Sequence, residues 1–298
     1  MAQSIVVHFG IHKTASTFLQ KRFFPGLEGV CYVPLRAERQ AFLDAVLRAD
    51  ALEFDAADAR ARLAAPEGAL PVVLSDEQFY GLVWDGAQAR GATAERLAAT
   101  LPGARAILVL RNQPDQLQSL YLQYVKTGGT ADPAGFLASG RHPLRVSPAY
   151  FRYAAYVEHL HRLFGAERVL VLLYEDLRAD AEGFLNRVCD FVGVPPTAWD
   201  RGILGERDNL SLSSRLVGPM RFVNALASSE RNPHHLLPRS VQTAARRALV
   251  RLSDRLPKGG PKALPGPDVA AFLTGCPESN RRLGALLGRD LAPLGYPT

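Results

Sequence analysis

The chain is poor in the residues that build disulfide networks, metal sites and membrane spans. Its three cysteines are odd in number and far apart, which favours neither a disulfide framework nor a metal-binding knuckle. We expect them to be reduced and packed as small hydrophobic side chains. No run of about 18 uncharged apolar residues occurs, and the start MAQSIVVHFGIHK lacks the basic region of a signal peptide. These absences predict a cytoplasmic protein without a membrane span or a bound metal.

Positive charge is concentrated in the C-terminal third. The chain carries a net charge of +6, but between Arg201 and Lys262 twelve Lys or Arg residues stand against four Asp or Glu, which gives +8 there and −2 elsewhere. Such an excess favours an anionic ligand, partner or surface. We expect no nucleic-acid partner.

Within this basic third, residues 240–256 predict an amphipathic helix. Two interpretations stay open: a surface helix with a solvated basic face, and a peripheral contact with a membrane or a polyanion. The predicted apolar face comprises Val241, Ala244, Ala245, Ala248, Leu249, Leu252 and Leu256, and the predicted basic face comprises Arg246, Arg247, Arg251 and Arg255.

Alternating strand and helix patterns predict an α/β fold. SIVVHFG, LPVVLSD, ARAILVLRN and ERVLVLLYED are short runs rich in Val, Ile and Leu, as expected of parallel strands buried on both faces, and GVCYVP is a fifth candidate. Helix-period stretches lie between and after them: 16–24, 39–47, 57–63, 89–101, 114–126, 148–164 and 179–192. A last helix begins near Ser279 or Asn280. The pattern favours a three-layer sandwich around a mainly parallel sheet of four to five strands. Residues 1–200 would form this core, and the helical, basic residues 201–298 would pack on the same domain.

The segment from Gly10 to Thr17 joins the first strand to a helix and has the composition of an anion cradle. Helix N-termini offer unpaired N–H groups to an anion, Lys13 adds a charge, and Thr14 and Ser16 add hydroxyls. A Walker A loop needs G-x-x-x-x-G-K-[ST], whereas Lys13 follows Gly10 by three residues without a second glycine. A Ser/Thr-capped helix start with a surface lysine is the alternative interpretation.

A second segment places an arginine and a serine after another predicted strand. Arg111 ends the strand AILVLR, and Ser119 follows eight residues later, about two turns into the next helix. Together they can converge on one anion, with the guanidinium binding it in a bidentate manner. Taken alone, this segment favours the other interpretation, an exposed Arg and an ordinary helical Ser.

The two segments together resemble the sulfotransferases that use 3′-phosphoadenosine-5′-phosphosulfate (PAPS). In that family K-[TS]-G-[ST]-[ST] follows the first strand, and here the loop reads Lys13-Thr14-Ala15-Ser16-Thr17, with Ala15 where glycine is usual. The second family motif, R-x-P-x-[DE]-x-x-x-S, resembles RNQPDQLQS, which has one extra position before the proline. VLVLLYEDLRADAEGFLNRVCDFVGVP, RDNLSLS and NRRLGALLGRDLAPLGYP also resemble later family segments in order, so the resemblance covers most of the chain.

The resemblance implies a P-loop-like fold and transfer of the sulfuryl group of PAPS to an acceptor hydroxyl, which releases PAP. It implies a saccharide, lipid or other small-molecule acceptor and no metal. Lys13 would contact the bridging oxygen, and the loop residues Thr14, Ala15, Ser16 and Thr17 would hold the 5′-phosphate. Arg111 and Ser119 would hold the 3′-phosphate.

The catalytic base is expected where the strand LPVVL ends in SDEQFYG. Sulfuryl transfer to a hydroxyl needs a group that takes its proton. Glu77 is the first choice, since bacterial relatives often carry an acid in a similar turn, and Asp76 is the second. The alternative is that one of these acids only caps the following helix.

Other polar and aromatic residues near these strand ends are weaker candidates. His12 is a third candidate base, whereas His8 lies within a strand and is expected to be a hydrogen-bonded core residue. Tyr80 and Trp84 line an acceptor pocket or pack beneath it.

Two functions of other classes compete with a sulfotransferase. A P-loop nucleotide or carbohydrate kinase is disfavoured by the order of the loop residues. The second alternative is a non-catalytic family member that binds PAP, or that binds a polyanion through its basic C-terminal third.

Overall fold

The structure is a computed structural model of the chain. It describes residues 3–35, 39–65, 68–138, 140–141, 144–205, 212–226, 239–256 and 261–298. Most of the segment RDNLSLS, which carries part of the family resemblance, lies outside these ranges.

All five predicted strands pair in one parallel sheet with the order β2-β3-β1-β4-β7. The register sets Phe9, near the end of β1, beside Asp76 of β3 and Leu108 of β4. The carboxyl ends of these three strands therefore lie at one edge of the sheet, as the sequence predicts. The strand bounds are β1 (Ile5–Phe9), β2 (Cys31–Pro34), β3 (Val72–Asp76), β4 (Arg105–Leu110) and β7 (Val169–Leu173), with a separate antiparallel pair of β5 (Gly140–Arg141) and β6 (Leu144–Arg145).

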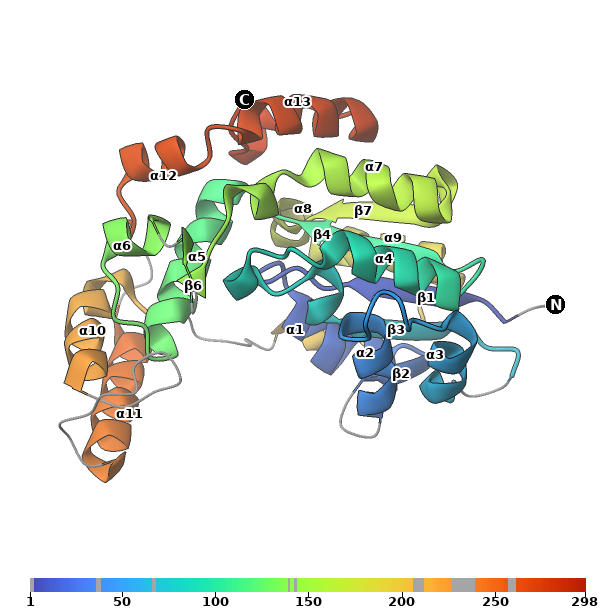
Figure 1. The fold of residues 1–298 in the computed structure, drawn as a ribbon, viewed down its shortest axis with the longest axis horizontal. Helices are drawn as coiled ribbons and strands as arrows, with labels where there is room; N and C mark the ends of the chain where they lie inside the picture. Colours follow the sequence, from blue (N-terminus) through green and yellow to red (C-terminus); the bar gives the residue numbers. More distant parts are fainter. Residues whose placement is uncertain are drawn as a thin grey trace.

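Helices cover both faces of the sheet, which confirms the predicted α/β sandwich (Figure 1). Because neighbouring residues of a strand point to opposite faces of the sheet, β1 contributes to a hydrophobic core on each side. Val7 and Phe9 belong to one core cluster and Val6 to the other. The helices are α1 (Ser16–Phe18), α2 (Gln40–Leu47), α3 (Ala56–Leu63), α4 (Arg90–Thr100), α5 (Gln113–Lys126), α6 (Pro133–Leu137), α7 (Tyr153–Phe164), α8 (Tyr174–Ala179), α9 (Ala181–Val192), α10 (Val217–Leu226), α11 (Arg239–Arg255), α12 (Gly266–Phe272) and α13 (Cys276–Leu287). Within the described ranges, none of these helices is long and apolar enough to cross a membrane.

Several helices are less regular than the sequence predicts. The helix expected over 16–24 is α only as far as Phe18 and continues as a π-helix and a 3-10 turn. The stretches 148–164 and 179–192 each divide, the first at Arg152 and the second at Asp180, whose side chain caps α9. The prediction that the last helix begins near Ser279 or Asn280 is wrong. It begins at Cys276, with a proline in its first turn.

The loop between β1 and α1 has an unusual backbone. Lys13 and Ala15 both adopt left-handed conformations, with φ of 69° and 68°. A residue with a Cβ pays roughly 1–2 kcal/mol for this conformation relative to right-handed backbone. The left-handed backbone at position 15 therefore favours glycine, the residue that the resemblance expects there. Strain of this kind is often stored at functional sites.

The C-terminal segment returns to the core through a buried amide pair. α13 packs against α7, and the side chains of Gln113 at the start of α5 and Asn280 of α13 exchange two hydrogen bonds of 2.7 and 3.2 Å. Asn280 also donates to the carbonyl of Pro297 at 2.7 Å. These contacts are consistent with one domain that includes residues 201–298. That these residues belong to the same domain as the core stays a prediction.

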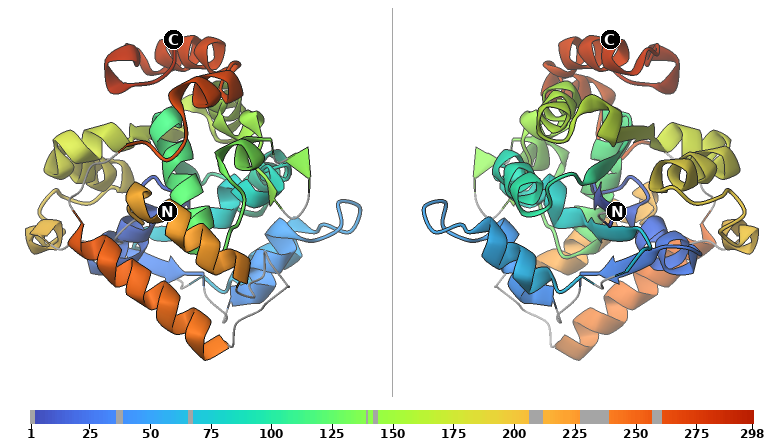
Figure 2. Two further views of the ribbon diagram at one scale, coloured as in Figure 1. Left: turned by 90° about the vertical axis from the view of Figure 1, so that its left-hand side faces the viewer. Right: turned by 90° about the vertical axis from the view of Figure 1, so that its right-hand side faces the viewer.

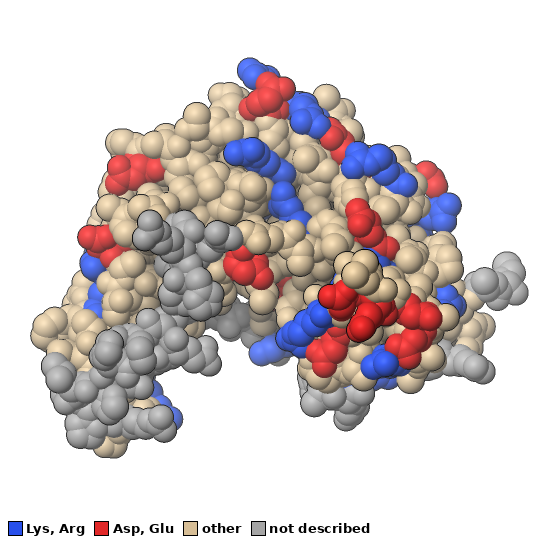
Figure 3. Space-filling view, in the orientation of Figure 1, with Lys and Arg blue, Asp and Glu red and all other residues tan. Residues whose placement is uncertain are grey.

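α10 and α11 form a two-helix arm at one end of the molecule, where α10 packs on α5 (Figures 1 and 2). Asn224 of α10 donates to the carbonyls of Val125 and Gly129, and Arg246 of α11 donates to the carbonyl of Lys126 at 3.0 Å. Figure 3 shows that the outline of the molecule is indented between the part that carries this arm and the part that carries α2 and α3.

The predicted faces of α11 are partly wrong. Polar residues lie on its packed side: Gln242 and Ser253 are buried and Arg246 is half-buried. By contrast, Val241 and Leu252 of the predicted apolar face are 47% and 45% exposed. The carbonyl of Lys126 and the backbone N–H of Ser213 explain the inversion, because they supply hydrogen-bond partners to Arg246 and Ser253.

Ala15→Gly should stabilise the protein by about 0.5–1 kcal/mol, because the gain from relaxing a left-handed alanine exceeds the entropy cost of a glycine. Urea denaturation measures the change. The matched control is Ala99→Gly at an exposed position of α4, which should destabilise by about 1 kcal/mol. Equal destabilisation by both substitutions would contradict the expectation.

Asn280→Ala should destabilise the protein by about 2 kcal/mol, since it leaves the buried Gln113 amide and the Pro297 carbonyl without their partner. We expect one unfolding transition, measured by circular dichroism and by tryptophan fluorescence, as for a single domain. The control is Arg281→Ala, which removes an exposed ion pair with Glu278 and should change stability by less than about 0.5 kcal/mol. Two separate transitions, with only one shifted by Asn280→Ala, would show that the C-terminal part folds independently.

Candidate functional site

The ends of β1 and β3 approach each other closely at Gly10. Its backbone N–H donates to the carbonyl of Asp76 at 3.0 Å. A Cβ at this position would lie 3.0 Å from the Cα of Glu77, closer than side-chain atoms normally pack. Glycine therefore fits this close approach without displacing its neighbours, and the approach brings the Lys13 loop beside the acids that end β3.

The Lys13 loop is held by its own hydroxyls and by α5. Thr14 and Ser16 both donate to the carbonyl of Ile11, at 2.8 and 3.0 Å, and Gln116 of α5 donates to the carbonyl of His12 at 2.8 Å. Two buried hydroxyls of the predicted cradle thus stabilise the loop, whereas Thr17 remains half-exposed.

The shape of this loop suits an anion. Its left-handed residues, Lys13 and Ala15, alternate with residues of ordinary backbone conformation. Such alternation turns neighbouring N–H groups toward a common point and forms a concave anion site. The start of α1 at Ser16 adds the N–H groups of a helix N-terminus.

Arg111 links the two predicted motifs. It leaves the end of β4 and donates through Nη1 to the carbonyl of Lys13 at 3.0 Å. Its guanidinium lies over the ring of Tyr174, 4.6 Å from the centroid, an arrangement that favours the cation. Its Nε is buried, and in the described part of the chain no acceptor lies within hydrogen-bonding distance of it. A buried donor without a partner is rare in proteins and indicates a place for a ligand acceptor.

The residue after Arg111 is fixed by the end of β7 and by the C-terminal segment. Glu175 accepts hydrogen bonds from the backbone and side-chain nitrogens of Asn112, each at 2.9 Å, and from the hydroxyl of Tyr296 at 3.3 Å. Asn112 in turn caps α5 by accepting from the N–H of Asp115. The helix that carries Ser119 and the strand that carries Arg111 are therefore held in one orientation. Ser119 itself is half-exposed on α5.

Glu77 and His12 face each other across the junction of β1 and β3. His12 Nε2 lies 3.8 Å from Glu77 Oε2. Burial raises the pKa of Glu77 above 4.5, the Asp76 carboxylate raises it further, and Lys13 opposes both effects. Burial and the charge of Lys13 lower the pKa of His12 to about 4, so this histidine is neutral near pH 7.

Asp76 performs a different task in this structure. Its side chain accepts a hydrogen bond of 2.7 Å from the backbone N–H of Gln78 and so caps the 3-10 helix Glu77–Tyr80. Burial raises the pKa of Asp76 as well. Of the two adjacent acids, Asp76 is therefore the capping residue, and Glu77 is the acid that faces His12.

Lys126 is a basic neighbour of the site that the sequence analysis missed. Burial lowers the pKa of Lys13; Glu77 raises it, and the positive charges of Lys126 and Arg111 lower it again. Lys126 therefore lies close enough to act on Lys13, although it belongs to the far end of α5 from Arg111. Its position in the last turn of a long helix gave no sequence signal, because basic residues are common there.

The remaining candidates pack around the site. His8 is fully buried and shares a hydrogen bond of 2.7 Å with Ser75, and burial lowers the pKa of His8 to about 3, so the expected core role is confirmed. Tyr80 is fully buried and donates to the carbonyl of Tyr150, which fits packing beneath a pocket. Trp84 is half-buried, and the centroid of its ring lies 6.3 Å from that of Tyr124.

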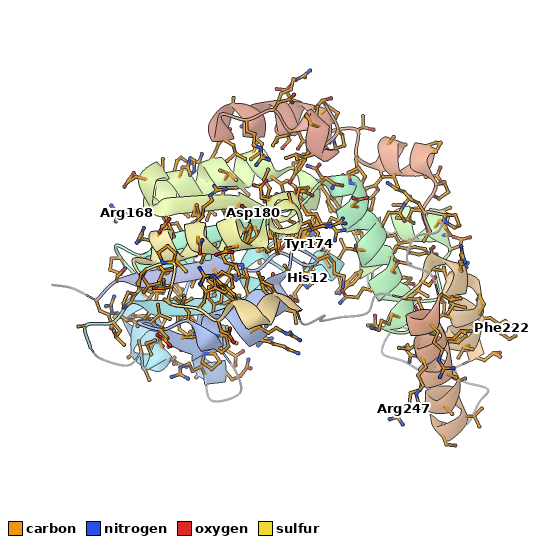
Figure 4. All side chains as sticks on the ribbon, turned by 180° about the vertical axis from the view of Figure 1, so that it is seen from behind. His12, Arg168, Tyr174, Asp180, Phe222 and Arg247 are labelled. Atoms are coloured by element: carbon orange, nitrogen blue, oxygen red, sulfur yellow. The ribbon has the colours of Figure 1, made fainter. Side chains whose placement is uncertain are left out.

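Tyr150 is a second residue that the sequence analysis missed, because its hydroxyl contacts the loop from a distant segment. It accepts a hydrogen bond from the backbone N–H of His12 at 3.3 Å. Figure 4 shows His12 in the same region of the molecule as Tyr174, whose ring lies beneath the Arg111 guanidinium.

In the described ranges, no cluster of three or more His, Cys, Asp or Glu residues is placed to hold a metal ion.

Comparison with known proteins identifies the family of the chain. A search with family models matches residues 31–200, more than half of the chain, to the sulfotransferase family. The match begins after the Lys13 loop and includes Glu77, Arg111 and Ser119. Mouse sulfotransferase 2A6 is 33% identical over 93 residues, and these span 30% of this chain and only about a third (32%) of that protein.

One of the similar solved structures shows the same fold. A sulfotransferase from Alicyclobacillus acidocaldarius aligns over 99% of both chains with a TM-score of 0.56 and 18% identity. Mouse sulfotransferase SULT7A1, solved in complex with PAP, aligns over 95% of this chain and 81% of its own with a TM-score of 0.39 and 13% identity. By its family match, this chain belongs to the sulfotransferase family.

Proposed function

We propose that the protein transfers the sulfuryl group of PAPS to a hydroxyl group of a small-molecule, saccharide or lipid acceptor and releases PAP. The observation that carries the proposal is the position of Arg111. Its guanidinium binds the Lys13 loop and keeps a buried N–H without a described partner. A donor with phosphate groups at both its 5′ and 3′ positions would engage the loop and this arginine together.

The residues present fit such a donor. The concave backbone around Ala15, the charge of Lys13 and the half-exposed Thr17 would hold the 5′-phosphosulfate. Thr14 and Ser16 would contribute mainly by shaping the loop, since their hydroxyls donate to Ile11. Arg111 and Ser119 would hold the 3′-phosphate. The binding groups are cationic side chains, hydroxyls and backbone N–H groups, and the site requires no metal ligand.

The transfer forms a bond between the acceptor oxygen and sulfur and breaks the bond between sulfur and the bridging oxygen of the 5′-phosphate. The acceptor loses its proton to a base, and the departing phosphate oxygen takes up negative charge. Lys13 would stabilise that charge, and its lowered pKa would make it a readier proton donor to this oxygen.

Glu77 is the proposed base. Burial and the Asp76 carboxylate raise its pKa, which makes its ionised form a better proton acceptor than an ordinary glutamate. Neutral His12, at 3.8 Å, would orient the carboxylate. Asp76 is a weaker choice because one of its oxygens already caps the next helix.

We also propose a cytoplasmic location. Cys31, Cys189 and Cys276 are free in the structure, as suits a reducing compartment.

The wild-type protein should bind PAP about 10- to 100-fold more tightly than AMP in isothermal titration calorimetry. The difference corresponds to about 1.5–3 kcal/mol for charged hydrogen bonds to the 3′-phosphate. Arg111→Lys and Ser119→Ala should each reduce this ratio, because AMP lacks that phosphate. Ser119→Ala should leave AMP affinity nearly unchanged, whereas Arg111→Lys also loses the hydrogen bond to the Lys13 carbonyl and should weaken AMP binding to a smaller extent than PAP binding. Arg111→Lys keeps the positive charge but removes the planar guanidinium that can bind a phosphate through two N–H groups. It therefore separates the effect of this geometry from the effect of charge.

Two results would replace the proposal. PAP binding no tighter than AMP would remove the 3′-phosphate site, and tighter binding of ATP with magnesium would favour a kinase. If PAP binds as expected, an acceptor library with labelled PAPS tests catalysis, with Lys13→Ala as the inactive control. Transfer to no acceptor in that library would favour a non-catalytic PAP-binding protein.

Glu77→Gln should slow sulfuryl transfer about 10²- to 10⁴-fold with little change in PAP affinity. In the wild type the rate should rise with pH as Glu77 ionises, with a midpoint above 4.5 because its pKa is raised. Below this midpoint the carboxyl is protonated and cannot accept a proton. The variant should lose this limb of the pH–rate profile, which is measured as kcat/KM from pH 4 to 8.

The matched control is Asp76→Asn, which keeps an oxygen to accept from Gln78 and should retain most activity. His12→Gln should reduce the rate by less than Glu77→Gln. An unchanged rate and pH profile in Glu77→Gln would show that the base lies elsewhere, and loss only in Asp76→Asn would transfer the role to that acid.

A further inference from the structure

The solvent-exposed face of α11 carries a row of arginines. Arg247, Arg251 and Arg255 are all exposed and follow each other at intervals of four residues, about 6 Å along the helix. In the described part of the chain, none of the three takes part in an ion pair. The whole helix contains five arginines and one aspartate. Unneutralised charges in a regular row favour a ligand with several negative charges.

This row is connected to the candidate site through the end of α5. Arg246, beside Arg247 in the chain, donates to the carbonyl of Lys126, and the charge of Lys126 acts on Lys13. Positive charge therefore continues from the loop proposed to bind the donor, over the last turn of α5, to the arm.

The first arginine of the row, Arg247, lies on the side of the arm that borders the indentation of the molecular surface. Figure 4 shows Arg247 on the side of the arm that is turned toward the rest of the molecule, where His12 lies, and Phe222 of α10 on the side that is turned away. The outline is indented between the arm and the opposite part of the core (Figure 3). A ligand that occupies the space between these parts can therefore contact Arg247.

We propose that the acceptor is an acidic saccharide, and that Arg247, Arg251 and Arg255 bind its carboxylate or sulfate groups while one of its hydroxyls reaches Glu77. The inference rests on the proposed function and names the substrate class of the same site. A chain of acidic sugars supplies both requirements: negative charges at repeated intervals for the arginine row, and hydroxyls for the transfer.

An anionic membrane is a poorer match for this face. A flat bilayer would have to contact the arginines from the side that the core flanks, and Phe222, the most exposed aromatic side chain of the arm at 68%, points the other way. An interfacial helix needs its apolar and basic residues to meet the same surface.

The test measures binding of three probes to the full chain in the presence of PAP by calorimetry: a hyaluronan hexasaccharide, neutral maltohexaose and a dT hexanucleotide. Vesicles of phosphatidylglycerol and phosphatidylcholine are tested by co-sedimentation. We expect the hyaluronan oligomer to bind at least tenfold more tightly than maltohexaose and than the nucleotide, and its affinity to fall with salt. In the variant Arg247→Gln/Arg251→Gln/Arg255→Gln its affinity should fall at least tenfold.

The matched control is Arg162→Gln/Arg168→Gln/Arg281→Gln, which removes the same charge from exposed positions on and around α7 and α13, away from the arm. It should keep saccharide affinity within about twofold. The PAP affinity of both triple variants should equal that of the wild type, so absence of PAP binding would refute the proposed function rather than the role of the arm. Equal binding of both saccharides, unchanged binding in the arm variant, or preferential binding of the nucleotide or the vesicles would each overturn the inference.

Discussion

The hydrogen bond from Arg111 to the carbonyl of Lys13 joins segments that are 98 positions apart in the sequence. Without it, the Lys13 loop and the end of β4 would be two separate basic features of one sheet edge. With it, the guanidinium is fixed between the strained loop and the ring of Tyr174. The bond is possible because β1 and β4 are adjacent parallel strands, so that the same sheet edge presents both of their ends.

The sheet and the two motifs were predictable from the sequence because each has a local cause. Parallel strands covered on both faces appear as uninterrupted apolar runs, and all five were found in this way. The Lys13 loop and the Arg111 segment follow such runs directly. Contacts made between distant segments left no such pattern: Tyr150 touches His12 from 138 positions away, and Glu175 reaches Asn112 from 63. A tyrosine or a glutamate with these roles looks like any other.

α11 shows how a correct periodicity can still misplace part of a helix face. The apolar positions of this helix do form a stripe, but the surface on which the helix packs offers carbonyl and N–H groups as well as apolar atoms. Arg246 and Ser253 satisfy those groups, and leaving a buried polar group unsatisfied costs more than burying one further methyl group gains. The neighbour, which the sequence pattern of one helix cannot reveal, decides the orientation. The identity of Lys126 as a neighbour of Lys13 was hidden for the same reason.

The attachment of Tyr296 to Glu175 also bears on how the protein can be handled. Tyr296 is 3% exposed, stands two residues before Thr298, and reaches the carboxylate that holds the backbone of Asn112. A force applied to the chain near Thr298 would therefore act on the segment that orients the end of β4. Donor affinities measured on protein tethered close to Tyr296 would include the effect of that force.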